Sequence, residues 1–352
     1  MIEAVQSRSD WHSLRVYLAE SVASVVEEID QNPKVLGQCL QGLGDRRLLG
    51  LKVPVGLGGS GFSATEYGLA VTEIARKSGI LAFLQTQHQS AAAMIARFGS
   101  EEQRKKLPQM VTGKLKVGVG FSQLRRAGQP MLRALPTAKG YELTGTIPWV
   151  TGFSFFQEAI AGATLPNGDE LYCFIPLENT PEISGGTINC GEPLALAAMG
   201  ASQTVAVKLE NWLITPEQIL VIKPAGSIQG GDRQNVLKHG FFALGCAYGC
   251  VDFLQQKLEQ SQLRILQERL DQLRSEIVTA LDTKKDFATQ LDLRLKVVAI
   301  AQEYAQCALI SSGGAGNLLI HPAQRLYREA LMFSVFGQTE TIRNATLQTL
   351  IY

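Results

Sequence analysis

The side chains best suited to catalysis or metal binding are widely spaced in this sequence. The four histidines are His12, His88, His239 and His321. Their separation matches no pattern of metal ligands, because metal sites draw on His or Cys residues at short, regular spacing. The six cysteines are Cys39, Cys173, Cys190, Cys246, Cys250 and Cys307. The closest pair lies within one apolar, helical stretch, so we expect buried free thiols and no metal site.

A glycine-dense stretch, VPVGLGGSGF at residues 53–62, has the composition of a loop that cradles a phosphate. Such a loop requires a strand before it and a helix after it, and this context is lacking here. Turn geometry is therefore the favoured interpretation of the stretch.

The composition is that of an ordinary globular protein. The chain has 352 residues, of which 45% are hydrophobic and 18% charged, which is enough for two or three packed domains. The formal net charge of +1, without clusters of Lys and Arg beside aromatic residues, argues against nucleic-acid binding. The start, MIEAVQSRSDWHSL, is acidic and polar, and no run of about 18 apolar residues occurs. We therefore expect a cytoplasmic protein with no membrane contact.

The spacing of apolar residues predicts three regions. Residues 1–115 have helical spacing and two capping boxes, Ser63 to Glu66 and Ser100 to Gln103, so we expect an N-terminal helical domain. Residues 116–222 carry alternating β-branched runs between Gly, Pro and Asn turns, which predicts a middle β domain. Residues 223–352 return to helical spacing. The predicted fold class is α+β, in the order α, β, α.

One long charged segment in the last region has a clear apolar face. Its members are Leu263, Leu266, Leu270, Leu273 and Ile277. Bundle core is the favoured interpretation of this leucine face. A coiled coil with a partner is the alternative, although the pattern runs for only about three heptads.

Four stretches together resemble the acyl-CoA dehydrogenase family. They are VPVGLGGSGFSATEYGLAVTEIAR, RFGSEEQRKKLPQMVTGK, GTIPWVTG and GGAGNLLIHPAQRLYREALMFSVFGQTETIR, and they span residues 53 to 343. The resemblance implies an N-terminal helical domain, a middle β-barrel or β-sandwich domain and a C-terminal helical bundle. It also implies a flavin-dependent oxidoreductase that binds FAD and acts on an acyl thioester or a related substrate.

The same resemblance implies a site for the flavin. Its residues are Ser122, Trp149, Val150, Thr151, Gln338 and Thr339. The stretch from Trp149 to Thr151 matches the family's W-I-T strand, and Ser122 stands where the family has a threonine hydroxyl. By itself Trp149 is equally consistent with a core aromatic of the β domain. The flanking Gly145 and Thr151 favour the cofactor interpretation.

The catalytic base of the family has no counterpart in this sequence. Gly337 occupies the position of the family's glutamate, and Asn235 lies near the position where other members carry the base. Neither side chain can accept a proton. Glu340 is interpreted as a surface or capping carboxylate, and Asp232 is an equally weak candidate. The catalytic residues are therefore unknown, and we expect little ordinary dehydrogenase activity.

Two further departures concern binding. In SQLRRAGQP, Gln123 replaces a glutamate of the family, and Arg125 and Arg126 are inserted. The substrate pocket is therefore expected to differ from that of the family. LQQKLEQ continues directly into SQLRILQERL, where the family has an arm that holds the FAD pyrophosphate of the neighbouring subunit. FAD binding is therefore expected to be weak or absent.

Three hypotheses about function follow from the resemblance, and fold does not decide among them. The first is a flavin oxidoreductase without an identifiable catalytic Glu, whose implied electron acceptor is an electron-transferring flavoprotein. The second is a flavin-dependent monooxygenase of the same fold, for which His239 and Ser334 are weak candidates near the flavin. The third is a catalytically degenerate structural or regulatory relative. We also expect a homodimer or homotetramer, to which the leucine face contributes apolar area.

Overall fold

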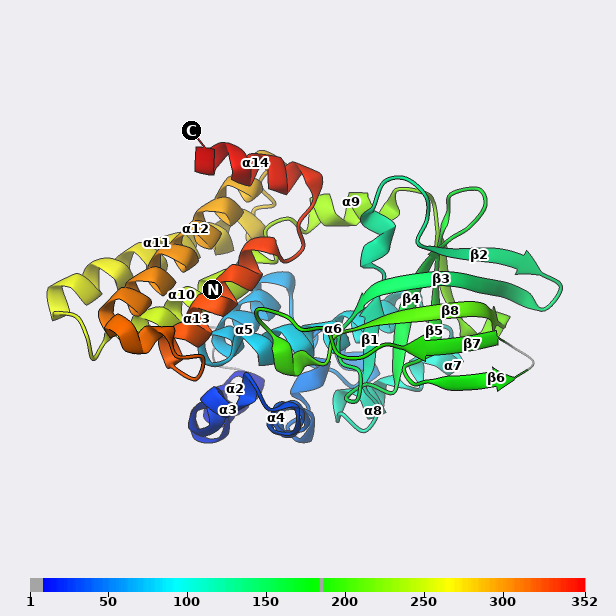
Figure 1. The fold of residues 1–352 in the computed structure, drawn as a ribbon, viewed down its shortest axis with the longest axis horizontal. Coiled ribbons are helices and arrows are strands. Elements are labelled where there is room, and N and C mark those ends of the chain that lie inside the picture. The colour runs from blue at the N-terminus through cyan, green and yellow to red at the C-terminus, as the bar shows by residue number, and fades with distance from the viewer. Residues whose placement is uncertain (1–8, 184–185, 352) are drawn as a thin grey trace.

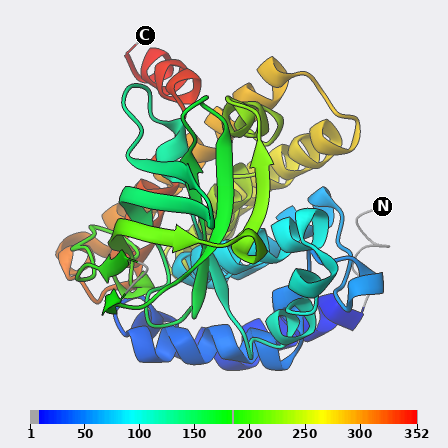
Figure 2. The ribbon, with the colours of Figure 1, turned by 90° about the vertical axis from the view of Figure 1, so that its right-hand side faces the viewer.

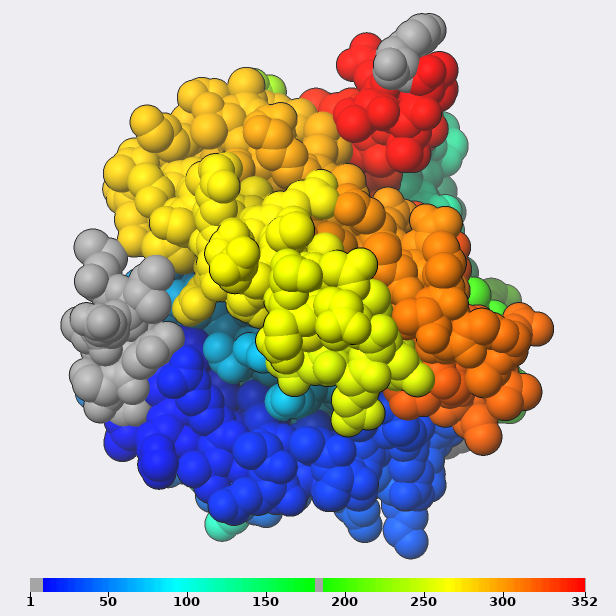
Figure 3. Space-filling view, turned by 90° about the vertical axis from the view of Figure 1, so that its left-hand side faces the viewer, coloured from blue at the N-terminus to red at the C-terminus, as the bar shows by residue number. Residues whose placement is uncertain are grey.

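The computed structural model describes residues 9–183 and 186–351, and most of its longer helices gather at one end of the molecule with the strands at the other (Figure 1). The N-terminal and C-terminal helices pack together, so the chain enters the β region and returns. Figure 3 shows the helical end, with the blue N-terminal helices beneath the yellow and orange C-terminal ones. Residues 1–8, which begin the acidic and polar stretch MIEAVQSRSDWHSL, lie outside the described residues.

The first region consists of helices and short helical turns. Its longer helices are α2 (Ser9–Tyr17), α4 (Pro33–Asp45), α5 (Ala64–Lys77) and α6 (Gly79–Phe98). Its short segments are η1 (Leu18–Val22), η2 (Ala23–Val25), α3 (Val26–Ile29), η3 (Leu48–Gly50), η4 (Val55–Leu57), α7 (Glu101–Arg104) and α8 (Leu107–Val111). Both predicted capping boxes are confirmed, one at the start of α5 and one at the start of α7.

The glycine-dense stretch is a turn, as predicted. Gly58 and Gly61 have φ values of +87° and +62°, which glycine adopts without strain. Ser60 N donates to the carbonyl oxygen of Gly50 at 3.0 Å, and Gly61 N donates to that of Val53 at 2.8 Å. The amides that a phosphate would need are already bonded within the turn.

The middle region is one mixed sheet of nine strands, counted over the described residues. The strands are β1 (Val117–Gly120), β2 (Leu132–Thr137), β3 (Gly140–Val150), β4 (Glu158–Thr164), β5 (Glu170–Pro176), β6 (Thr180–Ile183), β7 (Gly186–Cys190), β8 (Val205–Ile214) and β9 (Ile219–Lys223). Their order is β6-β7-β8-β3-β2-β4-β5-β9, and β1 pairs with β4 in parallel. Figure 2 shows the strands of this region, in green, in front of the helices. The short turns η5 (Ser122–Arg125), η6 (Gly200–Ser202) and η7 (Pro216–Gln218) lie between strands.

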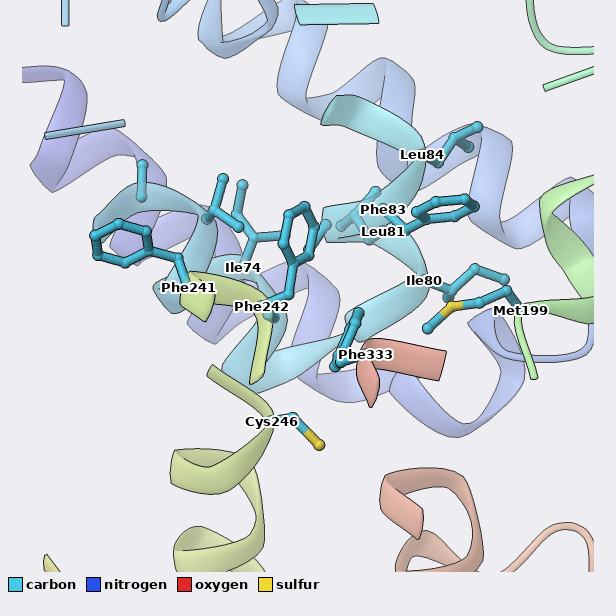
Figure 4. Close-up of a cluster of buried hydrophobic side chains, with 14 of the residues drawn as sticks. Ile74, Ile80, Leu81, Phe83, Leu84, Met199, Phe241, Phe242, Cys246 and Phe333 are labelled. Atoms are coloured by element: carbon cyan, nitrogen blue, oxygen red, sulfur yellow. The ribbon is translucent and has the colours of Figure 1, made fainter. Parts of the chain in front are cut away.

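The last region is the predicted helical bundle. Its helices are α9 (Ser227–Gln234), α10 (Gly240–Leu254), α11 (Gln260–Asp282), α12 (Phe287–Ser312), α13 (Pro322–Val335) and α14 (Glu340–Ile351), with the turn η8 (Gly313–Asn317) before α13. The α+β class and the order α, β, α are therefore confirmed. α10 is buried along almost its whole length, and the ring of its Phe242 packs at a tilt against Phe333 of α13 in the core, with the ring centroids 5.5 Å apart (Figure 4). This helix joins the two helical regions.

The leucine face belongs to this core. Leu263, Leu270, Leu273 and Ile277 are buried, and Leu266 packs against them. The bundle interpretation is confirmed. The expectation that this face contributes apolar area to an oligomer is wrong, because the chain's own helices already cover it.

Three further observations concern sites that the sequence analysis considered. All six cysteines are free, and all but the half-buried Cys307 are buried. Within residues 9–183 and 186–351, His, Cys, Asp and Glu side chains form no group of three or more placed to hold a metal ion. Over the same ranges, every helix is too short or too polar to cross a membrane.

Candidate functional site

Trp149 lies near the end of β3 with its indole turned outward. The pairing of β3 with β8 shifts register between Ile147 and Val150, so both of these side chains are fully buried. Trp149, between them, is 46% exposed. A core role for this indole is excluded, and the side chain offers an open apolar face.

Thr151, two residues after Trp149, belongs to a buried chain of hydroxyl groups. Its Oγ1 lies 2.9 Å from Oγ1 of Thr204, which in turn lies 2.9 Å from Oγ of Ser202. The backbone N–H of Gly152 also donates to the carbonyl oxygen of Ser202 at 3.1 Å. These bonds fix the end of β3 to the loop that precedes β8, so Trp149 stands on a rigid support.

Ser122 and Gln338 contribute polar atoms that the protein itself does not satisfy. Ser122 begins η5, which lies against β3, and Gln338 lies between α13 and α14. Ser122 Oγ and Gln338 Oε1 are both buried without a hydrogen-bond partner among the described residues. Leaving such an atom without a hydrogen bond costs about 1 to 3 kcal/mol, so both oxygens are available to a ligand.

Gly337, at the position where the resemblance implies a base, lies against the ring of His239. Gly337 has a φ of +61°, and a Cβ built on it would lie 2.8 to 3.1 Å from three atoms of the His239 ring. The same imidazole packs edge-on against Phe336 at 4.8 Å. Phe83 and Phe242 surround Phe336 at 5.1 and 5.2 Å, so the histidine belongs to a rigid aromatic cluster.

His239 is held in its neutral form. Burial lowers its pKa, the positive charges of Arg294, Arg125, Lys238 and Lys52 lower it further, and the result is about 3. A neutral imidazole with so low a pKa is a poor proton acceptor at neutral pH. It does carry one N–H donor and one free nitrogen. Over the described part of the chain, its ring makes no hydrogen bond.

The other acid or base candidates are occupied or exposed. Asp232 accepts two hydrogen bonds from Arg125, at 2.7 and 2.8 Å, so it is committed to an ion pair. Asn235 donates its side-chain amide to the carbonyl oxygen of Gly231 at 2.7 Å. Ser334 donates to Leu331 O within its own helix. Glu340 is exposed in the first turn of α14, where a helix N-terminus favours a carboxylate.

Thr339 also has a structural task. Its Oγ1 accepts from the backbone N–H of Ile342 at 3.3 Å, and its carbonyl oxygen accepts from Arg343 N at 2.9 Å. It therefore caps the N-terminus of α14. Of the two residues expected in this loop, Gln338 retains a free polar atom and Thr339 does not.

Arg294, which the sequence analysis did not identify, connects the segment before His239 to the loop that carries Gly337. This buried guanidinium donates to the carbonyl oxygen of Val236 at 3.0 Å and to that of Phe336 at 2.6 Å. Gly337 O lies 3.4 Å from the same nitrogen. An arginine amid the apolar residues LRLKVVAI of α12 was the sequence signal for this role.

Arg125 connects the turn that bears Ser122 to the C-terminal helical region. This residue lies in the same short turn as Ser122, and its partner Asp232 lies in α9. Four residues after Asp232, Val236 O accepts a hydrogen bond from Arg294, which also donates to Phe336 O. The structure thus brings the turn bearing Ser122 and the loop bearing Gly337 to one region of the molecule.

The connection from α10 to α11 consists of residues 255–259 only. Gln255 and Leu258 still bond back to the last turn of α10, through Val251 O and Leu254 O at 3.2 and 3.0 Å. No extended segment projects from this corner of the described structure.

The chain is similar in sequence to known acyl-CoA dehydrogenases. The family model described as "Acyl-CoA dehydrogenase, N-terminal domain" matches residues 11–114. The short/branched chain specific acyl-CoA dehydrogenase of Bos taurus is 23% identical, over 95% of this chain and 83% of that protein. An acyl-CoA dehydrogenase of Bacillus subtilis (strain 168) is also 23% identical, over 94% of this chain and 93% of its own length.

Solved structures show the same fold. Butyryl-CoA dehydrogenase from Megasphaera elsdenii superposes with a TM-score of 0.80 at 18% identity, over 99% of this chain and 98% of that one. A glutaryl-CoA dehydrogenase from Mycobacterium smegmatis in complex with FADH2 gives a TM-score of 0.78 at 19% identity, over 99% and 96% of the two chains.

Proposed function

Because this chain belongs to the acyl-CoA dehydrogenase family, we propose that it is a flavin-binding oxidoreductase for an acyl thioester or a related substrate that works without a carboxylate base. The observation that carries this proposal is the buried hydroxyl of Ser122, which has no partner among the described residues and lies in a turn that contacts the strand bearing the exposed indole of Trp149. An open aromatic face with a free hydroxyl suits a planar ring that has polar edges.

The residues present fit the ring of a flavin. Trp149 would contact its face, while Ser122 Oγ and Gln338 Oε1 would bond to polar atoms at its edge. The hydroxyl chain behind Thr151 would keep the platform rigid. When bound, the flavin supplies the acceptor for a hydride from the substrate.

The chain offers fewer residues to bind the pyrophosphate of FAD than to bind the flavin ring. The short connection between α10 and α11 supports the expectation that the clamping arm is missing. Each hydrogen bond to a charged group is worth about 1.5 to 3 kcal/mol, so its loss weakens binding roughly tenfold or more. We therefore propose weak FAD binding, carried mostly by the ring.

Removal of the proton α to the thioester is the step that lacks a protein group. Gly337 has no side chain, and the neighbouring His239 is a weak base because its pKa is about 3. General base catalysis contributes roughly 10²- to 10⁴-fold, so turnover of straight-chain acyl-CoA should be negligible.

A flavin titration tests the proposal. We expect FAD to bind with a dissociation constant above about 10 nM, which corresponds to −11 kcal/mol, and Trp149→Ala to weaken it at least tenfold. Trp212→Phe is the control, because Trp212 lies on β8 and is only partly exposed. Binding tighter than 10 nM would show that another clamp replaces the arm. A protein that takes up neither FAD nor FMN would contradict the proposal and favour a structural or regulatory role.

The monooxygenase alternative has one supporting observation. It calls for a His near the flavin, and His239 lies at the base position. Flavin-dependent oxygen consumption with substrate, without reduction of a dye acceptor, would favour it over the dehydrogenase type. An electron-transferring flavoprotein as electron acceptor remains part of the dehydrogenase proposal alone.

A further inference from the structure

The turn η5, which carries Ser122, has little structure of its own to hold it in place. It is a 3-10 turn of four residues without a side-chain cap, and the exposed residues 126–130 follow it. Near its start, Gln123 Nε2 donates to the carbonyl oxygens of Gly162 and Gly120 at 2.6 and 3.3 Å. These bonds hold the start of the turn against β4 and β1, and the end of the turn needs another support.

Helix α9, which lies between the helical end and the strands, supplies this support (Figure 1). Nε and Nη2 of Arg125 donate to the two carboxylate oxygens of Asp232 at 2.7 and 2.8 Å. Gln229 Nε2 donates to the carbonyl oxygen of Leu124 at 3.2 Å. Residues spaced as Gln229 and Asp232 are share one side of a helix. One side of α9 therefore lies along the end of the turn.

The pair of Arg125 and Asp232 is suited to fix a position. A bidentate contact between a planar guanidinium and a carboxylate restricts both the distance and the orientation of the two groups. The side chain of Arg125 is 27% exposed and that of Asp232 14%, so water screens this pair less than it screens an ion pair on the open surface. Loss of the Asp232 charge should therefore release the end of the turn.

Helix α9 is weak by itself and is anchored to the sheet. Gly230 and Gly231 lie in its middle, each costing about 1 kcal/mol relative to alanine, and its residues other than the buried Ile228 are half-buried or exposed. Ile228 N donates to Glu170 Oε1 of β5 at 3.0 Å, and Glu170 Oε2 accepts from the Tyr172 hydroxyl at 2.7 Å. Glu170 is buried, and a carboxylate is favourable at the start of a helix. β5 thus holds α9 in place.

The same anchor contacts the other end of the turn. The Tyr172 ring packs edge-on against Phe121, with the ring centroids 5.6 Å apart, and Phe121 directly precedes Ser122. Contacts therefore form a closed path from Phe121, through Tyr172 and α9, to Arg125. Ser122 lies within this path, so the turn is held on both sides of it, while its hydroxyl has no partner among the described residues.

We propose that Asp232 is a positioning residue, which fixes through Arg125 the turn that presents Ser122 to the flavin ring. The inference deepens the proposed function and rests on it for the identity of the ring. It gives the inserted Arg125 a role other than contact with the substrate. It also gives Asp232 a role that depends on its negative charge and requires no proton transfer.

Amide hydrogen exchange of residues 121–126, measured without flavin, tests the support of the turn. Asp232→Asn keeps the shape of the side chain and removes its charge, so we expect exchange in this segment to become about tenfold faster or more. The control is Asp252→Asn, because Asp252 also accepts a bidentate pair, from Arg76 at 2.8 and 2.5 Å. This control should leave residues 121–126 as they are in the unmodified protein.

Two further variants separate a local effect from a failure to fold. Arg125→Asp/Asp232→Arg restores the pair with its charges exchanged, so it should recover part of the protection that Asp232→Asn loses. If Asp232→Asn does not fold, Arg125→Gln removes the same pair and should give the same faster exchange. Urea midpoints of Asp232→Asn and Asp252→Asn that are close to each other would show that the faster exchange is local.

A double-mutant cycle on FAD binding tests whether Asp232 acts through Ser122. Ser122→Ala should weaken binding about tenfold in the unmodified protein. It should weaken binding by less than about twofold when Asp232→Asn is already present, because the hydroxyl is then no longer held in place. The visible circular dichroism of the bound flavin should change with Asp232→Asn and not with Asp252→Asn. A merely structural role would lower stability without coupling the two changes.

The two experiments distinguish this inference from the proposed function. The inference is overturned if exchange at residues 121–126 is equal in Asp232→Asn and Asp252→Asn, or if Ser122→Ala weakens FAD binding by the same factor in both backgrounds. If the unmodified protein binds neither FAD nor FMN while Asp232→Asn still loosens the turn, the proposed function fails and the positioning of Ser122 by Asp232 stands.

Discussion

Gly337 determines at the residue scale whether a carboxylate base can be restored. A glutamate there would place its Cβ 2.8 to 3.1 Å from the His239 ring and adopt a φ of +61°. Overpacking costs about 1 to 3 kcal/mol and the left-handed backbone about 1 kcal/mol more. We therefore expect Gly337→Glu to be destabilised and to reduce a dye acceptor with acyl-CoA no faster than the unmodified protein.

Removing the His239 ring tests whether its clash with the new side chain limits Gly337→Glu. Gly337→Glu/His239→Gly opens the space, so we expect it to recover part of the stability and to turn over acyl-CoA faster than either single variant. Gly128→Ala and Gly337→Ala form a matched pair, because Gly128 also has positive φ but meets no atom within 4 Å. A urea midpoint for Gly337→Ala equal to that of Gly128→Ala would refute the clash.

His88 couples stability to pH. Its buried Nδ1 accepts from Val117 N at 3.1 Å, so Nε2 carries the proton and donates to Met110 O at 3.0 Å. Burial lowers its pKa to about 4, against about 6.5 when unfolded. A lowered folded-state pKa means that this stabilisation is complete above pH 6.5 and is lost as pH falls through 4.

The expected loss from His88 is at most about 3 kcal/mol of unfolding free energy between pH 6.5 and 4. His88→Asn should therefore flatten the pH dependence over this range, measured by urea unfolding. His12→Asn, at an exposed position of α2, is the control. The prediction fails if both variants keep the slope of the unmodified protein.

Sequence patterns predict some of these site residues and not others, because local patterns do not describe tertiary contacts. Trp149 was located by its motif, but its exposure depends on a register shift against β8, which no local pattern reveals. His239 and Gly337 meet through tertiary packing between the start of α10 and the loop after α13. Propensity and spacing describe neighbours along the chain, so that contact could not be predicted.

At the scale of elements, one face of α11 is buried in the bundle and the opposite face is exposed. Leu270 is fully buried within the bundle, while Ile265 is 63% exposed. We expect Leu270→Ala to lower the free energy of unfolding by about 2 to 5 kcal/mol, because it leaves a cavity. Ile265→Ala should change it by less than about 0.5 kcal/mol. Equal urea midpoints for the two variants would contradict the assignment of the leucine face to the core.

Elements were the most predictable level of this structure. The capping boxes at Ser63 and Ser100 and the periodicity of α11 are local signals, and each was read directly from the sequence. The pairing of β1 with β4 in parallel is not local, since β2 and β3 lie between them in the chain. Arg294 likewise bonds two segments distant from α12, which a helical pattern does not specify.

At the scale of the whole molecule, an exposed apolar surface lies outside the leucine face. It comprises the turn before α13 and one stripe of that helix, and we call it the α13 face. Its residues are Leu318, Leu319, Ile320, Tyr327, Leu331 and Val335, each more than 40% exposed. Tyr327, Leu331 and Val335 recur every fourth residue and so share one side of α13. Exposed apolar side chains gathered on one element commonly mark a contact with another chain.

We expect the protein to be a homodimer or homotetramer that pairs through the α13 face. Burial of about 25 cal/mol per Å² makes several exposed aliphatic side chains a substantial source of association energy. A charge at the centre of such a contact is costly, so Leu331→Glu should shift the mass measured by light scattering toward the 38.2 kDa monomer. Ile265→Glu adds the same charge at an exposed aliphatic residue of α11 and should leave the assembly intact.

An unmodified protein that is monomeric at micromolar concentration would refute the expectation of an oligomer. An assembly that survives Leu331→Glu and dissociates with Ile265→Glu would move the interface from α13 to α11.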